Sequence, residues 1–165
     1  MIRNAFDENY REILVEWLES HSGDVRLSED SNMDETRISI TPLGSNTCPL
    51  LIASRNGSTQ IHLGKSIHFD EIDDLRSDDG AKLTTKMSGH EFRSLLDAVL
   101  SGSVRETVMY KQDVIIKSSG EVQLNGKTYK TRTTTLRALF CRPDRRVDHV
   151  YSRAVAAPGS LSNRL

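Results

Sequence analysis

The dipeptide Asn56-Gly57 constrains the fold of this 165-residue chain more than any other feature of its sequence, because it lies between two short apolar runs. Asn followed by Gly readily adopts the positive backbone dihedrals of a two-residue type I′ turn, which matches the twist of a β-hairpin. Such a turn places Ile52 opposite Ile61 and Leu50 opposite Leu63, so that all four apolar side chains lie on one face. We therefore predict an antiparallel hairpin with one buried face.

A second dipeptide of the same kind, Asn125-Gly126, predicts a second hairpin, in which Val122 faces Tyr129. Alternating or extended apolar patterns predict further strands along the chain. These strands are expected at residues 36–41, 67–69, 104–110, 114–117 and 146–153, with a short helix at 136–140. The last third of the chain is therefore expected to form a meander of antiparallel strands.

Two segments carry apolar residues at the three- and four-residue spacing of amphipathic helices. In the first, the only tryptophan is a core anchor, and Asn4 is placed to cap the first turn. The apolar face of this helix consists of Phe6, Tyr10, Ile13, Leu14, Trp17 and Leu18. In the second, Ser88 and Glu91 form a capping box, and Gly102 ends the helix. The predicted fold class is α+β, with the two amphipathic helices packed on one face of a mainly antiparallel sheet.

The length suits a single domain, which we place at residues 1–157, followed by a disordered tail at 158–165. Two polar stretches, 24–35 and 70–80, are predicted to be exposed connections. The first seven residues lack the apolar segment of a secretory signal peptide, and the longest apolar run is far shorter than the roughly 20 residues of a membrane span. We therefore expect a cytoplasmic protein with no membrane partner.

The formal net charge of −1 conceals two halves of opposite charge. Residues 1–80 contain 16 acidic and 7 basic residues, whereas residues 81–165 contain 7 acidic and 15 basic residues. This division excludes a uniformly basic nucleic-acid-binding protein and a uniformly acidic disordered chain. A small domain with two charged poles favours a protein partner over a small-molecule substrate.

Two motifs that suggest ligand binding do not have the spacing that their chemistry requires. Gly64-Lys65-Ser66 matches the end of a phosphate-binding loop, but Thr59 occupies the position of the first required glycine. The acidic stretch that begins at Asp30 matches the start of a calcium loop, but Glu35 stands where the sharp turn requires glycine. We therefore predict neither a phosphate site nor a calcium site at these positions.

Histidines and cysteines give no stronger indication of chemistry. His62 and His68 are placed to meet across neighbouring strands, and Asp70 would complete a metal site with them, but histidines that simply lie on a strand surface are the favoured interpretation. Cys48 and Cys141 are far apart in the chain and are interpreted as free thiols. We predict no metal, no cofactor and no catalytic residues, and hence a function that is not enzymatic.

The region 88–132 contains a capped helix, a small turn and several strands in a recognisable order. The segments are Ser88-Gly89-His90-Glu91-Phe92 through Leu100, Gly102-Ser103, Val104-Arg105-Glu106-Thr107-Val108, Val114-Ile115-Ile116 and Glu121-Val122-Gln123-Leu124. In this order the region resembles small bacterial α+β immunity proteins of polymorphic or contact-delivered toxin systems. The resemblance implies a cytoplasmic protein that binds a cognate toxin and neutralises it, and it carries over no site residues.

On this hypothesis, acidic residues of the first helix and of the 70–79 stretch contact the toxin, because opposite charge accelerates association. The predicted contacts are Glu12, Glu16, Glu19, Asp70, Glu71, Asp73, Asp74, Asp78 and Asp79. An acidic toxin would instead bind the basic residues Lys130, Arg132, Arg142, Arg145 and Arg146. The basic region 127–153 also supports an alternative function as a nucleic-acid-binding or regulatory module. The sequence leaves open which pole binds and what the oligomeric state is.

Overall fold

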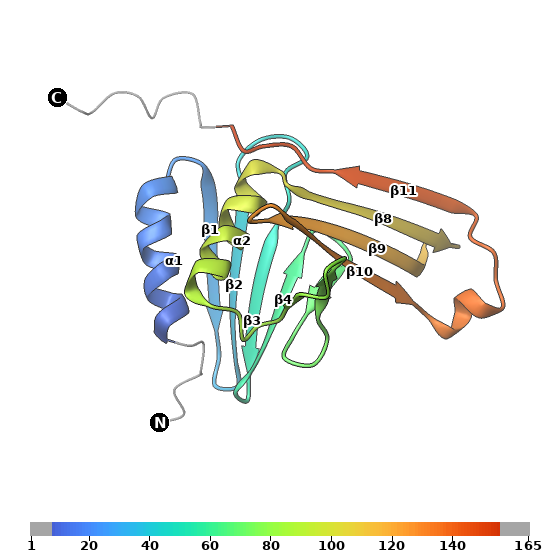
Figure 1. Ribbon diagram of the computed structural model, residues 1–165, viewed down its shortest axis with the longest axis horizontal. Coiled ribbons are helices and arrows are strands. Elements are labelled where there is room, and N and C mark those ends of the chain that lie inside the picture. Colours follow the sequence, from blue (N-terminus) through green and yellow to red (C-terminus); the bar gives the residue numbers. More distant parts are fainter. Residues whose placement is uncertain (1–7, 156–165) are drawn as a thin grey trace.

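The computed structural model describes residues 8–155 and confirms the predicted α+β class (Figure 1). Two helices, α1 (Glu8–His21) and α2 (Gly89–Ser101), pack against each other beside two antiparallel sheets. Within this range, neither helix has the length and apolar character needed to cross a membrane. The predicted cap at Asn4, the start of the first apolar face at residue 6 and the predicted tail at 158–165 lie outside the described residues.

The first sheet has five antiparallel strands that follow one another in chain order. They are β1 (Val25–Ser31), β2 (Glu35–Pro42), β3 (Leu50–Arg55), β4 (Ser58–Leu63) and β5 (Ile67–Phe69). The hairpin of β3 and β4 has the predicted register, with Ile52 paired to Ile61. Asn56 and Gly57 have φ values of 50° and 79°, as a type I′ turn requires.

The second sheet has six strands in the order β11-β8-β9-β10-β6-β7. They are β6 (Leu75–Ser77), β7 (Lys82–Leu83), β8 (Val104–Lys111), β9 (Val114–Leu124), β10 (Lys127–Thr134) and β11 (Arg145–Val150), and a 3-10 helix, η1 (Leu136–Leu139), connects the last two. Val122 pairs with Tyr129, which confirms the second hairpin. Because β6 and β7 precede α2 in the chain but join β10, two separate parts of the sequence build this sheet.

The prediction that residues 24–35 form a connection is wrong, because β1 pairs with β2 from Val25 to Ser31. β1 is the outermost strand of its sheet, and every residue after Val25 is exposed. After Leu27 this strand contains only polar residues, so its sequence lacks the sustained apolar alternation by which half-buried strands are recognised.

The prediction for residues 70–80 is wrong in part, since Leu75–Ser77 forms β6 within that acidic stretch. Leu75 is fully buried and pairs with Leu83 of β7. Ile72 and Leu75 are too few to give this acidic stretch a periodic pattern. The pairing that orders β6 comes partly from β10, far along the chain. The strand predicted at 114–117 and the first strand of the second predicted hairpin, which contains Val122, are one continuous strand, β9, because Ser118 to Gly120 also pair with β10.

Buried residues from both helices and both sheets form a single hydrophobic core. Trp17 is fully buried, as predicted, and its Nε1 donates a hydrogen bond of 2.8 Å to the carboxylate of Asp97 on α2. Tyr10 of α1 packs on Phe92 of α2, with ring centroids 4.7 Å apart. These contacts hold α1 against α2, with its opposite face turned outward.

The boundaries of α2 are those that the sequence predicts. The Ser88 side chain accepts a hydrogen bond from the amide of Glu91, and the Glu91 side chain accepts one from the amide of Ser88. Gly102 follows the helix with a φ of 72°, a left-handed conformation in which glycine is favoured. The local capping signals therefore suffice to define this helix.

Candidate partner-binding surfaces

The two ends of the longest axis of the molecule differ in the charge of their residues. α1 and β1 form one end, and η1 with the loop that follows it forms the other (Figure 1). The first end, which we call the acidic end, carries exposed side chains of Glu12, Glu16, Glu19, Glu29 and Asp30. The second end is formed by residues 132–146, which contain five arginines and one aspartate. The two charged surfaces therefore face in opposite directions.

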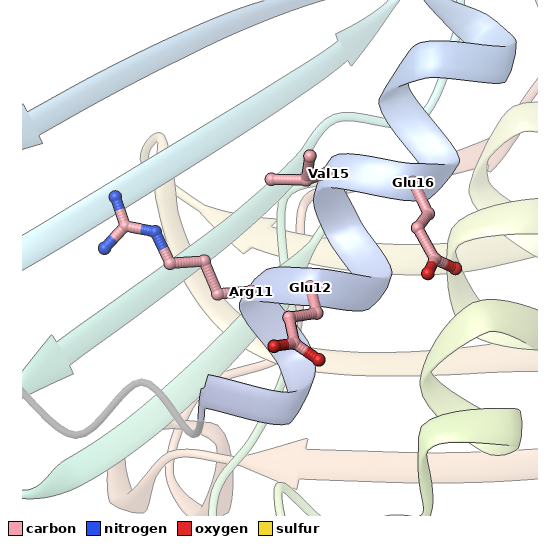
Figure 2. A pocket seen from close by; sticks show the side chains of 4 residues that line it. All are labelled: Arg11, Glu12, Val15 and Glu16. Atoms are coloured by element: carbon pink, nitrogen blue, oxygen red, sulfur yellow. The ribbon is translucent and has the colours of Figure 1, made fainter.

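A pocket of about 420 Å³ lies on the acidic end, lined by Arg11, Glu12, Val15 and Glu16 of α1. Figure 2 shows Glu16 pointing toward α2, where its carboxylate lies 3.8 Å from the guanidinium of Arg93. Arg11 and Val15 project from the other side of α1 (Figure 2), and the Arg11 guanidinium lies 3.9 Å from the carboxylate of Glu29 on β1. The pocket therefore lies on α1 between a side chain that reaches α2 and one that reaches β1.

β1 adds an open strand edge to the acidic end. Within residues 8–155 it pairs only with β2, so its outer edge presents backbone N–H and C=O groups to another strand. Leu27 of β1 and Val15 of α1 are each about half exposed. No lysine or arginine of the described residues forms an ion pair with Glu12 or Glu19. This end thus combines unpaired carboxylates, apolar side chains and a free strand edge.

The predicted acidic contacts at Asp78 and Asp79 are engaged by basic residues of β10. Asp78 lies 3.1 Å from the ammonium of Lys130, and Asp79 lies 2.7 Å from that of Lys127. The hydrogen bond from Lys127 is the main reason that the pKa of Asp79 is well below its usual range. Both pairs are exposed and individually weak. They nevertheless bring the acidic stretch and the basic region together, so that each neutralises part of the other.

The remaining acids of residues 70–79 are mostly engaged as well. Asp70 accepts hydrogen bonds from the amides of Ile72 and Asp73 at 2.6 and 2.8 Å, and these bonds lower its pKa. Asp74 lies 2.7 Å from Arg76 and 3.3 Å from Lys82, and Glu71 lies 3.0 Å from Lys86. The side chain of Asp73 is exposed. This stretch is therefore a less open acidic surface than α1.

Three of the five predicted basic contacts also have acidic partners. Lys130 pairs with Asp78, Arg145 with Asp113 at 3.0 Å and Arg146 with Asp148 at 3.0 Å. Arg145 also lies over the ring of Tyr110, 4.4 Å from its centroid. Arg132 and Arg142 form no ion pair within the part of the chain that the structure describes.

Three large apolar side chains that follow Arg132 in the chain are exposed. The sequence pattern did not predict their exposure. Leu136, Leu139 and Phe140 are 80%, 68% and 87% exposed, and η1 contains no buried residue. We call residues 136–142 the apolar tip. The short helix itself was predicted, but four residues have too little periodicity to indicate whether a face is covered. The available signal was the presence of three large apolar residues in a segment rich in arginine.

His62 and His68 meet, as register partners on β4 and β5 with ring centroids 6.1 Å apart. Burial, and then the nearby His68, lower the pKa of His62. Asp70, the third member of the hypothetical metal site, binds the amides of its own loop. Within residues 8–155, no group of three or more His, Cys, Asp or Glu side chains is arranged to hold a metal ion.

Glu106 of β8 is a buried acid whose carboxylate binds the turn between β4 and β5. It accepts hydrogen bonds from the Lys65 amide at 2.8 Å, the Ser66 amide at 2.9 Å and the Ser66 hydroxyl at 2.6 Å. The Tyr151 hydroxyl donates a further bond. Lys65 and Ser66 thus bind a carboxyl group, but this group belongs to a residue of the same chain. We call this contact between the two sheets the Glu106 junction.

The two thiols differ in their surroundings, and we expect them to differ in reactivity. Burial raises the pKa of Cys48 to about 12, whereas Cys141 is only half-buried in the apolar tip. Because the thiolate is the reactive form, the native protein should react rapidly with one equivalent of a colorimetric disulfide reagent, and with two after denaturation. Cys141→Ser should abolish the rapid reaction and Cys48→Ser should preserve it. Equal reaction rates for both thiols in the native protein would contradict this expectation.

The geometry therefore provides two exposed surfaces suited to recognition, the acidic end and the apolar tip, which lie at opposite ends of the molecule (Figure 1). The Glu106 junction, in contrast, is buried and structural. Comparisons of the chain with protein-family models, with curated proteins and with solved structures found no match.

Proposed function

We propose that this chain is a binding protein that neutralises a partner protein by covering a basic surface with its acidic end. In the immunity-protein hypothesis, the partner is a bacterial toxin and the binding takes place in the cytoplasm. The observation that carries the proposal is the composition of the acidic end, where the exposed carboxylates of Glu12 and Glu19, which have no basic partner within residues 8–155, lie beside a pocket and an open strand edge.

Each of these features contributes a different part of binding. Carboxylates such as Glu12 and Glu19 accelerate the encounter with a basic partner, because opposite charges steer association. Val15 and Leu27 offer half-exposed apolar surface that a partner side chain can cover, and contacts of this kind slow dissociation. The edge of β1 offers backbone hydrogen bonds to an extended segment of the partner.

The acids of residues 70–79 have a smaller role in this proposal than the sequence suggested. Asp74, Asp78 and Asp79 would have to exchange ion pairs within the chain for ion pairs with the partner. Such an exchange brings little net gain at an exposed site. We therefore assign recognition to α1 and β1.

The first test is co-expression of the chain with the product of each neighbouring gene in its source genome. We expect one neighbour to stop growth when expressed alone, and the chain to restore growth and to co-purify with it. If no neighbouring product is toxic or forms a complex with the chain, the proposed function is wrong.

Charge reversal then tests the assignment of the binding surface in the purified complex. Glu12→Lys combined with Glu19→Lys should slow association about tenfold at low salt, with a smaller effect at high salt, because steering is screened by ions. The matched control is Asp73→Lys with Glu121→Lys, which changes the net charge equally at exposed sites outside α1 and β1. An equal loss of association rate in both double variants would show that binding responds to net charge and not to the acidic end.

A further inference from the structure

We infer that the apolar tip, residues 136–142, docks on the surface of a membrane that contains anionic phospholipids. This inference concerns the opposite end of the molecule from the acidic end and does not depend on the proposed function (Figure 1). The expectation of no membrane partner came from the lack of a long apolar run. That criterion identifies segments that span a bilayer and does not address segments that lie on its surface.

The apolar part of the tip is concentrated and has no cover within residues 8–155. Leu136, Leu139 and Phe140 are among the most exposed large apolar side chains, and they come from five consecutive residues. Exposed apolar residues that occur singly are ordinary, but a cluster indicates a surface that another phase or molecule covers. Leucine and phenylalanine are also the side chains that amphipathic segments insert at the boundary between headgroups and acyl chains.

Several arginines lie close to this apolar cluster in the chain. Arg137 belongs to η1 itself, and Arg142 closes the tip. Arg132, Arg145 and Arg146 flank the tip in the sequence, and the ion pairs of the last two are largely exposed. Arginines near a bilayer are attracted to anionic headgroups, and each adds to binding until salt screens the attraction. The apolar and basic residues therefore act on the same target.

The tip is held in position by hydrogen bonds at both ends. Before η1, the amide and the hydroxyl of Thr135 donate to the Ile116 carbonyl at 2.9 and 3.1 Å. After η1, the Asp144 amide donates to the Tyr110 carbonyl at 3.0 Å. Because the segment is already ordered where β8 ends and β9 begins, insertion requires little loss of chain entropy.

A membrane fits these features better than nucleic acid does. Phosphates of RNA or DNA would pair with the arginines, and Phe140 could stack on a base, but Leu136 and Leu139 would remain exposed to water. A bilayer accepts all three apolar side chains and all the cations together. In this arrangement the acidic end points away from the membrane (Figure 1), where it is accessible to a protein partner.

The test is co-sedimentation of the full chain with vesicles. We expect binding to phosphatidylcholine vesicles that contain about 30% phosphatidylserine, weak binding to phosphatidylcholine alone, and release as salt is raised to about 0.5 M. Leu139→Ser with Phe140→Ser should weaken binding about tenfold or more, and Arg137→Gln with Arg142→Gln about tenfold. Circular dichroism should be unchanged in both variants, since none of these four side chains is buried.

Ile72 and Met33 provide the matched control, because they are 89% and 93% exposed but lie in other loops. Ile72→Ser with Met33→Ser should bind vesicles as strongly as the parent. The inference is overturned if the parent does not bind anionic vesicles, or if the Leu139/Phe140 variant binds as strongly as the parent. It is also overturned if the parent binds an RNA or DNA oligonucleotide but does not bind vesicles, and if the Arg137/Arg142 variant no longer binds that oligonucleotide.

Discussion

Replacement of Glu106 by alanine should lower the free energy of unfolding by about 3–5 kcal/mol, because it removes the acceptor of four hydrogen bonds and each donor left unsatisfied costs about 1–3 kcal/mol. The carboxylate accepts hydrogen bonds from the Lys65 amide, from the amide and hydroxyl of Ser66, and from the Tyr151 hydroxyl. Alanine would leave these donors without their acceptor around a position where the native side chain is only 3% exposed. The loss of stability would therefore be larger than the loss expected from removing the methylene groups of the Glu106 side chain alone.

Denaturation in urea, followed by circular dichroism, measures this effect. Glu121→Ala is the matched control, because Glu121 is an exposed acid on the neighbouring strand, and its replacement should change stability by no more than about 0.5 kcal/mol. Tyr151→Phe removes a single donor and should cost about 1 kcal/mol. If Glu106→Ala is as stable as the Glu121 control, the Glu106 junction does not stabilise the fold.

Replacement of Gly120 by alanine should also be strongly destabilising, at about 1–3 kcal/mol, because it overpacks the contact between the two sheets. Gly120 is the register partner of Glu106, and a Cβ atom on it would overlap Cγ1 of Ile67 and lie 2.5 Å from Cδ1. Ile67 belongs to β5 and is buried, so its side chain has little room to move away. The absence of a side chain at Gly120 thus allows β5 to approach β9.

A double-mutant cycle separates this overlap from a general intolerance of change in β9. In an Ile67→Ala background, Gly120→Ala should cost much less than in the parent, since the overlapping atoms are gone. Ser119→Ala, at the exposed neighbouring position, should be close to neutral. Equal costs of Gly120→Ala in the two backgrounds would show that the contact with Ile67 is not the cause.

The features that the sequence predicted correctly are those set by neighbouring residues. Asn56-Gly57 determines the register of its hairpin through the turn alone, and Ser88 with Glu91 determines the start of α2. In each case the interacting residues are within about ten positions of each other, so the sequence pattern contains all of the information.

The features that the sequence did not predict depend on distant partners. β6 is ordered by pairing with β10, and the exposed strand β1 by pairing with β2, without an apolar pattern of its own. Glu106 illustrates a signal that was present but ambiguous. Its position between Val104 and Val108 in an alternating strand places it on the buried face, but the residues that bind it are about forty positions away.

The same dependence governs the candidate surfaces. The sequence identified the acids of α1 and the arginines near the C-terminus, but it could not show that Asp78 and Asp79 are held by Lys130 and Lys127. Nor could it show that Phe140 is uncovered, since exposure depends on what the rest of the chain places nearby.

The pairing of β6 with β10 has a consequence for the order in which the protein folds. Asp78 and Lys130, which join across this pairing, are 52 residues apart, so β6 and β7 leave the ribosome well before the strand on which they pack. Until β10 is available, the β6–β7 hairpin is too short to be stable alone. We therefore expect the six-stranded sheet to close late and slowly compared with α2, whose contacts are local, and we expect fragments that end before residue 127 to leave this sheet incomplete.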